Sequence, residues 1–120
     1  MSGFSRTVTV RLKADTTYVY ERASSVMTLQ EFRETLSSTA PTAVAPLLRA
    51  LWHDARGEWQ EAHRIAQDID DNDGAWVHAY LHRKEGDLDN ATYWYQQASQ
   101  PVATDSLDTE WARIAAALLQ

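Results

Sequence analysis

Three side chains of types that bind metals stand close together beyond the middle of the chain. His78 and His82 are four residues apart, and Glu85 follows three residues later. On a helix these spacings place side chains on one face, so the three could offer two imidazoles and a carboxylate to zinc or another divalent metal, as in a small metal-dependent enzyme. A polar helix face, or hydrogen bonds between repeats, explains the same pattern. Because no glutamate stands between the histidines as in a metalloprotease helix, we favour this second interpretation and expect no cofactor.

The two other histidines add little to a metal site. His53 precedes His82 by 29 residues, and each stands at the end of a predicted helix. This correspondence predicts a shared structural role, such as a hydrogen bond across the following turn. His63 complicates the interpretation of His78 and His82 only slightly.

The acidic segment from Asp68 to Gly74 has the composition of a calcium-binding loop but not its register. A loop that starts at Asp68 places Asp73 where the invariant glycine of an EF-hand belongs, and one that starts at Ile69 aligns Gly74 but lacks the first ligand. A solvated turn that favours the N-terminus of the next helix explains the segment better. The sequence also lacks a phosphate-binding loop, a dinucleotide fingerprint and a nucleophile triad. We therefore expect a binding module rather than an enzyme.

Hydrophobic periodicity predicts the elements that must position these side chains. Apolar residues recur at helical spacing over six segments: residues 29–37, 43–56, 59–69, 75–85, 88–99 and about 106–119. Thr28 and Glu31 have the spacing of a capping box before the first segment, and Gly57 and Gly86 end the second and the fourth. Since no strand is needed after residue 26, the sequence predicts an all-α domain over residues 27–120.

Residues 1–26 differ from the rest, because apolar and polar residues alternate there as in a strand. A lone two-stranded hairpin is only marginally stable, so we expect this leader to be mobile. Residues 2–7 and 10–18 resemble a short interspersed repeat that is translated at the edges of many bacterial open reading frames. That resemblance implies that the leader is not native and that the natural chain starts at Met27.

The composition excludes several classes of function. The chain of 120 residues suffices for one domain with a modest core, and it contains no cysteine, which excludes disulfides and thiolate metal sites. Residues 1–26 contain four basic and two acidic residues, so residues 27–120 contain seven and fifteen, a net charge of −8. Such a surface repels phosphate backbones, and we expect no nucleic acid as partner. No apolar run approaches the ~20 residues of a membrane span, so we expect no membrane association and a cytoplasmic location.

A shift of 29 residues aligns similar residues from two parts of the chain: Ala50 with Ala79, His53 with His82, Gly57 with Gly86, Ala62 with Ala91, and Gln67 with Gln96. The alanines let antiparallel helices approach closely, and the glycines allow tight turns. The sequence Gly-Asp-Leu-Asp-Asn-Ala at residues 86–91, followed by Tyr95 and Ala98, resembles the second half of a tetratricopeptide or Sel1-like repeat. Over residues 43–100 this resemblance implies antiparallel helical hairpins stacked as a short right-handed solenoid. Residues 74–87 and 93–95 also resemble a group of small bacterial proteins of unassigned function.

In tetratricopeptide-like folds the first helix of each hairpin faces a groove that holds peptides. On this mapping seven residues line the groove: Leu47, Leu51, Asp54, Trp76, Tyr80, Arg83 and Lys84. Arg83 or Lys84 could pair with a carboxylate of the ligand. The resemblance therefore implies a small adaptor or scaffold that binds a peptide, a protein partner or its own copy. The alternative is that the aromatic rings only pack the hairpins together.

Overall fold

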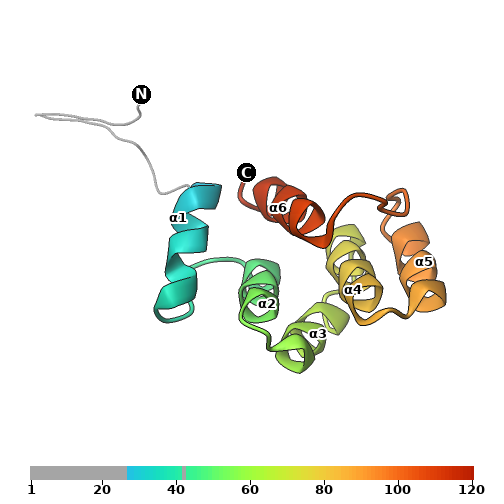
Figure 1. Cartoon of the computed structure of the whole chain (residues 1–120), viewed down its shortest axis with the longest axis horizontal. Coiled ribbons are helices and arrows are strands. Elements are labelled where there is room, and N and C mark those ends of the chain that lie inside the picture. Colours follow the sequence, from blue (N-terminus) through green and yellow to red (C-terminus); the bar gives the residue numbers. More distant parts are fainter. Residues whose placement is uncertain (1–26, 42) are drawn as a thin grey trace, which may run out of the picture.

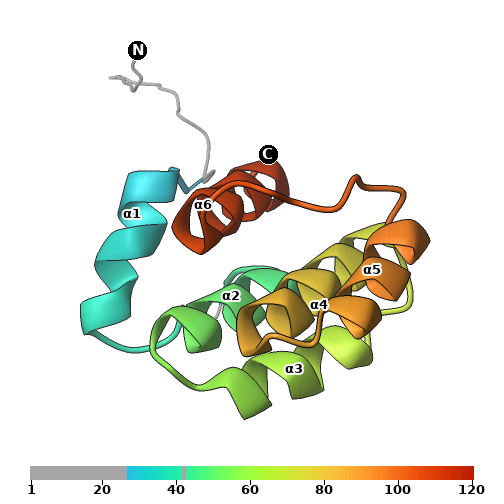
Figure 2. The same ribbon diagram turned by 45° about the vertical axis from the view of Figure 1, so that its right-hand side comes forward.

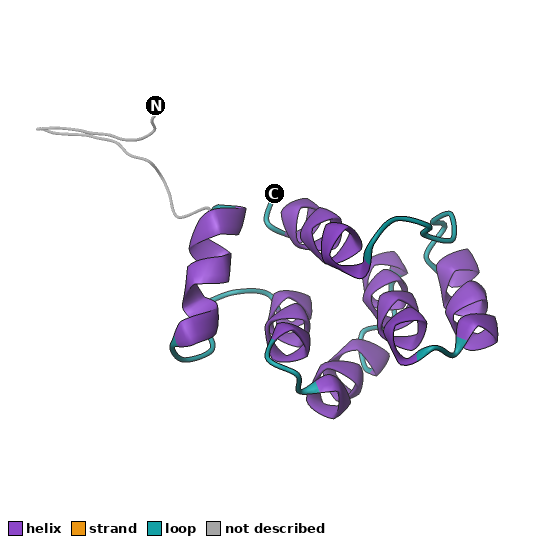
Figure 3. Cartoon of the chain, in the orientation of Figure 1, coloured by secondary structure: helices purple, strands orange, loops and turns teal. Residues whose placement is uncertain are grey.

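The structure, a computed structural model, describes residues 27–41 and 43–120. These residues form six α-helices and one short 3-10 helix, without a strand (Figures 1 and 3). The elements are α1 (Leu29–Glu34), η1 (Thr35–Ser37), α2 (Pro46–Ala55), α3 (Trp59–Gln67), α4 (Asn72–Glu85), α5 (Leu88–Gln97) and α6 (Leu107–Leu118). The predicted all-α class is confirmed. The predicted mobile leader, residues 1–26, lies outside the described residues.

The chain forms two helical hairpins, α2 with α3 and α4 with α5, which lie side by side through the contact of α3 with α4 (Figure 1). Both turn at a glycine with positive φ, Gly57 at 80° and Gly86 at 92°. The amide after each glycine donates to a carbonyl oxygen five residues back, at 2.9 Å in the first turn and 3.0 Å in the second. This is the Schellman arrangement, in which glycine is favoured because other residues rarely adopt positive φ. Positions 29 residues apart therefore share the same local structure.

The central helix is α4, in which every residue of Gly74–His82 is buried. It begins at Asn72, before the predicted start at residue 75, because the Asp71 side chain accepts a hydrogen bond from the Gly74 amide (2.8 Å) and caps the helix. The acidic segment thus supplies a helix N-terminus, as its composition indicated. With 14 residues α4 is short for a membrane span, and no helix in the described part of the chain is long and apolar enough to cross a bilayer.

The last helix, α6, returns across the side of the hairpins that α2 and α4 form, and it also contacts α1 (Figure 2). Trp111 Nε1 donates to the Leu51 carbonyl oxygen (3.0 Å), and the Trp111 ring stacks on Phe32 with 5.8 Å between centroids. Because both rings are buried, they join α1, α2 and α6 in one core. The chain's own C-terminal helix therefore covers much of the face where α2 and α4 lie.

Candidate functional site

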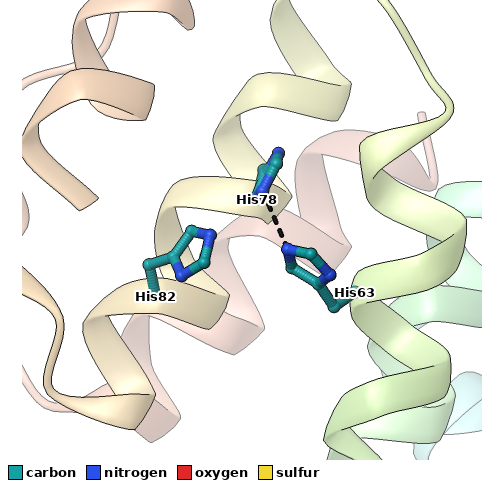
Figure 4. Close-up of side chains that lie close together, drawn as sticks. All are labelled: His63, His78 and His82. Atoms are coloured by element: carbon teal, nitrogen blue, oxygen red, sulfur yellow. Dashed lines mark hydrogen bonds between the residues drawn. The ribbon is translucent and has the colours of Figure 1, made fainter. Parts of the chain in front are cut away.

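Three histidines from two helices meet between the hairpins (Figure 4). His63 lies on α3, and His78 and His82 lie about one turn apart on α4. The Nε2 atoms of His63 and His78 are 3.0 Å apart. One ring nitrogen from each histidine lies within 4.8 Å of the other two. Since α3 belongs to the first hairpin and α4 to the second, this histidine cluster joins the two hairpins.

Tryptophan rings hold two of the histidines in place. His63 stacks on Trp59 with 4.9 Å between centroids, and His78 stacks on Trp94 with 4.1 Å. Trp59 is itself tied to α4, because its Nε1 donates to the Leu81 carbonyl oxygen (2.8 Å). His78 is only 7% exposed. The rings are therefore positioned by packing before any ligand binds.

Hydrogen bonds hold the third ring. His82 Nδ1 lies 2.6 Å from a Glu85 carboxylate oxygen, and its Nε2 lies 3.3 Å from the Asn90 side-chain amide, across the turn between α4 and α5. His53 Nδ1 also bonds across a turn, that of the first hairpin, to Glu58 at 2.7 Å. The predicted shared role of the two histidines is confirmed. A carboxylate on Nδ1 fixes the tautomer of His82 and leaves the lone pair on Nε2.

The structure brings together a different trio from the one that the sequence pointed to. Glu85 lies on the Nδ1 side of His82, and His63 joins His78 and His82 in its place. The sequence does contain a signal for His63, which follows Trp59 by four residues and so shares the face of α3 that packs against α4. That signal is easily missed because His63 is far from the pair along the chain.

Burial keeps two members of the cluster neutral. It is the main reason that the pKa of His78 is lowered to about 4, and the nearby His63 and His82 rings contribute in the same direction. Burial also lowers the pKa of His63, with a further lowering from His82 and an opposing effect of Glu85. Both rings are therefore neutral at pH 7. Neutral imidazole is the form that binds metals.

A cavity of about 560 Å³ opens beside the cluster, and His78 and Trp94 form part of its wall. Carboxylates and amides supply the rest of its polar lining: Gln67, Asp68, Asp70, Asp71, Asn72 and Gln97. None of the described residues that line it is a lysine or an arginine. A small neutral or cationic molecule could therefore approach His78, whereas an anion would be repelled.

The residues predicted to line a peptide groove divide into two sets. Leu51 and Arg83 contact α6 directly, whereas Leu47 and Trp76 are buried side chains that line smaller openings beside α6 and the loop before it. Three line an open cleft: Asp54, Tyr80 and Lys84. The two cations expected to meet a ligand's carboxylate have partners within the chain, Arg83 with Glu110 (2.8 Å) and Lys84 with Asp54 (3.0 Å). The surface open to a ligand on this side is therefore smaller than the predicted groove.

One buried carboxylate was not anticipated from the sequence. Glu110 is 0% exposed and accepts hydrogen bonds from the Tyr95 hydroxyl (2.6 and 2.8 Å) and from Arg83 (2.8 Å). Burial, and then the bond to Glu110, raise the pKa of Tyr95. The signal lies in the helical spacing, because Glu110 follows the apolar Leu107 by three residues and precedes the apolar Ile114 by four, and so shares their face of the helix.

Comparisons with known families, proteins and structures identified no relative of the chain. No family model, curated protein or solved structure matches the chain. Its function must therefore be inferred from the chemistry of its own residues.

Proposed function

We propose that the chain binds a divalent transition metal, with zinc as the first candidate, through His63, His78 and His82. The observation that carries the proposal is the convergence of three imidazole nitrogens within 4.8 Å. Two nitrogens that bind one tetrahedral zinc, each about 2.0–2.1 Å from it, are about 3.3 Å apart. The 3.0 Å between the Nε2 atoms of His63 and His78 is close to this value, so small side-chain rotations would complete the site.

The surroundings of the cluster favour a cation. Glu85 accepts a hydrogen bond from Nδ1 of His82, the ring nitrogen that in metal-binding histidines usually faces a carboxylate or a carbonyl oxygen while the other nitrogen binds the metal. The tryptophan stacks restrain His63 and His78, so less side-chain freedom is lost on binding. The formal charge of −6 also raises the local concentration of metal ions.

Without a metal, the same cluster is a hydrogen-bonded pair with a third ring beside it. At 3.0 Å, His63 and His78 share one N–H···N hydrogen bond. A metal requires both nitrogens to direct lone pairs at the ion, so the shared proton moves to the Nδ1 atom of the ring that donated it. This hydrogen bond and the 3.3 Å contact between the Asn90 amide and His82 Nε2 are both lost, at about 1 kcal/mol each. Structural zinc sites gain about 10 kcal/mol or more, which exceeds that cost.

The direct test is a titration of the full chain with Zn²⁺ in competition with a chromophoric chelator. We expect one ion per chain and a higher thermal midpoint, with about 2.7 kcal/mol of added stability when free zinc is about a hundred times Kd. His63→Gln, His78→Gln and His82→Gln should each abolish this rise. His53→Gln is the matched control, because His53 is the fourth of the chain's 4 histidines and bonds to Glu58 outside the cluster. Equal zinc binding by His63→Gln and His53→Gln would rule out the three-histidine site.

A metal-dependent hydrolase is a second candidate, favoured by the cavity beside His78. Three protein ligands leave one tetrahedral position for water, as in catalytic zinc sites, and zinc lowers the pKa of bound water to about 7. The cavity volume of about 560 Å³ is in the range of small-molecule sites. The zinc-loaded chain should then hydrolyse a neutral ester, p-nitrophenyl acetate, faster than free zinc or zinc-treated His78→Gln does. Equal rates would remove this candidate.

We also propose that the two hairpins form a tetratricopeptide-like pair, as part of a short right-handed solenoid. Their equivalent glycine turns support this arrangement. So does the burial of the small residues at matched positions: Ala50, Ala62, Ala79 and Ala91. Small buried residues at these places let the paired helices approach closely.

A further inference from the structure

A second site lies on the other side of α4. Tyr80 and Lys84 follow His78 and His82 by two residues each, which places them about 200° around the helix. There a cleft of about 380 Å³ opens, and residues of α1, α2, α4 and α6 line it. Four charged groups line the cleft: Arg33, Asp54, Lys84 and Asp108. The cleft shares no residue with the histidine cluster.

Two of these charges form the floor of the cleft and satisfy each other. Asp54 is only 2% exposed, and its two carboxylate oxygens accept from the Tyr80 hydroxyl (2.9 Å) and from Lys84 Nζ (3.0 Å). Burial, and then Asp54, raise the pKa of Tyr80, so the hydroxyl stays a donor. A buried carboxylate is costly to keep without partners, and here both partners come from α4. The floor is therefore polar, rigid and electrically balanced.

The other two charges lie at the rim and have no opposite charge to pair with among the described residues. Arg33 and Asp108 are exposed, and neither forms an ion pair with a residue of 27–41 or 43–120. The Arg33 guanidinium lies 5.8 Å from the centre of the Trp111 ring. Leu36 and Ala55 add apolar surface between the rim and the floor. The cleft thus offers one guanidinium, one carboxylate and an apolar wall.

We infer that this cleft binds a small zwitterion, a free α-amino acid with an apolar side chain. Arg33 receives the carboxylate, because guanidinium presents paired donors that match two carboxylate oxygens. Asp108 receives the ammonium group. The apolar side chain of the ligand lies against Leu36 and Trp111.

Charge and size select an amino acid over other ligands. The four charged groups of the lining sum to zero, so a ligand with a single charge would leave either Arg33 or Asp108 without a partner. A volume of about 380 Å³ is near the lower end of small-molecule sites. A long peptide would need the predicted groove beyond the cleft, but α6 covers Leu51 there. We therefore infer a small molecule as the ligand on this side, in place of the peptide or protein that the sequence led us to expect.

The test is an NMR titration of the ¹⁵N-labelled full chain, kept in EDTA so that metals do not contribute. The reporter is the Trp111 indole N–H, which donates to the Leu51 carbonyl within the cleft wall. L-phenylalanine should shift this signal saturably, with a Kd on the order of 1 mM or tighter. N-acetyl-L-phenylalanine lacks the ammonium group and L-phenylalanine amide lacks the carboxylate. Each should bind about tenfold more weakly, because one charged contact is lost.

Two variants that each remove one charge test whether Arg33 binds the carboxylate of the ligand and Asp108 its ammonium group. Arg33→Gln should weaken L-phenylalanine binding about tenfold and leave the amide unchanged, while Asp108→Asn should weaken it similarly and leave the N-acetyl derivative unchanged. Arg64→Gln and Asp89→Asn are the matched controls, because both residues are exposed and lie outside the cleft. Both controls should bind as the unchanged chain does.

Three outcomes would overturn the inference. The first is the absence of a saturable Trp111 shift with L-phenylalanine up to about 10 mM, well above the expected Kd. The second is equal affinity for N-acetyl-L-phenylalanine, which would indicate a site for a lone carboxylate such as a peptide C-terminus. The third is that Arg33→Gln binds as well as Arg64→Gln.

Discussion

The buried polar groups on the two sides of α4 differ in charge: one side has hydrogen-bonded imidazole rings, and the other has ion pairs. On the side that faces α3 and α5, His78 and His82 meet His63, and burial lowers the pKa of His78 to about 4. Neutral rings can approach closely, as the 3.0 Å between His63 and His78 illustrates. Since the lone pairs of these rings are not used in ion pairs, this side retains capacity to bind a cation.

The side that faces α2 and α6 consists of ion pairs. Lys84 lies 3.0 Å from Asp54, and Arg83 lies 2.8 Å from Glu110. These charges stabilise the contact between helices and are already satisfied, so they are poor candidates for ligand recognition. Polar residues alone therefore do not reveal a site. The two sides differ in the partners of their polar atoms: neutral hydrogen bonds that a metal could replace on the histidine side, and ion pairs within the chain on the other.

The largest effect is expected on the ion-pair side. Glu110→Ala removes the buried carboxylate that Arg83 and Tyr95 share, so it should lower the free energy of unfolding by about 3–5 kcal/mol. Urea denaturation at pH 7 measures this change. Glu58→Ala is the control, because the Glu58 side chain is 46% exposed, and it should cost less than about 1 kcal/mol. A loss below about 1 kcal/mol in Glu110→Ala would show that the two sides do not differ in this way.

On the histidine side of α4, the contribution to the free energy of unfolding should depend on pH. The pKa of His78 is about 4 in the folded chain against 6.5 in a free side chain, so between these values the unfolded chain binds more protons. The stability that His78 contributes is complete above pH 6.5 and is lost as the pH falls to 4, by about 3 kcal/mol for this pKa difference. Urea midpoints of the metal-free chain between pH 7 and pH 4 measure it. His78→Gln should flatten the pH dependence and His53→Gln should not; equal curves would contradict the prediction.

The helices of this fold were predictable because their signals are local. The capping box at Thr28 and the glycines that end α2 and α4 all appear in the structure where the sequence placed them. The position of α6 was not predictable, because packing onto α2 and α4 depends on contacts such as Trp111 with Leu51, 60 residues apart. No periodic pattern within α6 encodes which helix it will cover.

The candidate site was only partly predictable for the same reason. His78 and His82 are identified from their spacing on one helix. His63 joins them only because α3 packs against α4, which brings together residues 15 positions apart. Likewise Arg33 and Asp108 reach one cleft from α1 and α6, and no motif in the sequence relates them.

A smaller effect, on zinc affinity, is expected from a change at Glu85, whose carboxylate we expect to orient the His82 ring. Glu85→Gln keeps the size of the side chain but weakens the bond to His82 Nδ1, which lies 2.6 Å from the carboxylate. Zinc affinity should fall about 10–100-fold, as it does when other hydrogen-bond partners of metal-binding histidines are removed. The chelator competition measures this change, and Glu61→Gln, on the exposed surface of α3 and paired with Arg64, serves as the control. Unchanged affinity in Glu85→Gln would mean that the carboxylate does not orient the ring.

The smallest change in the free energy of unfolding is expected for Arg33 and Asp108 at the rim of the cleft, because their charges are not part of the ion pairs that hold the helices together. Arg33 is exposed and forms no ion pair with a described residue, so Arg33→Gln should change the free energy of unfolding by less than about 0.5 kcal/mol. Asp108→Asn should cost slightly more, up to about 1 kcal/mol, because Asp108 lies in the first turn of α6 and favours the helix dipole there. Urea denaturation without added ligand measures both. If Arg33→Gln cost as much as Glu110→Ala, Arg33 would be part of the structural ion-pair system, and the contrast between satisfied and free charges on this side of α4 would fail.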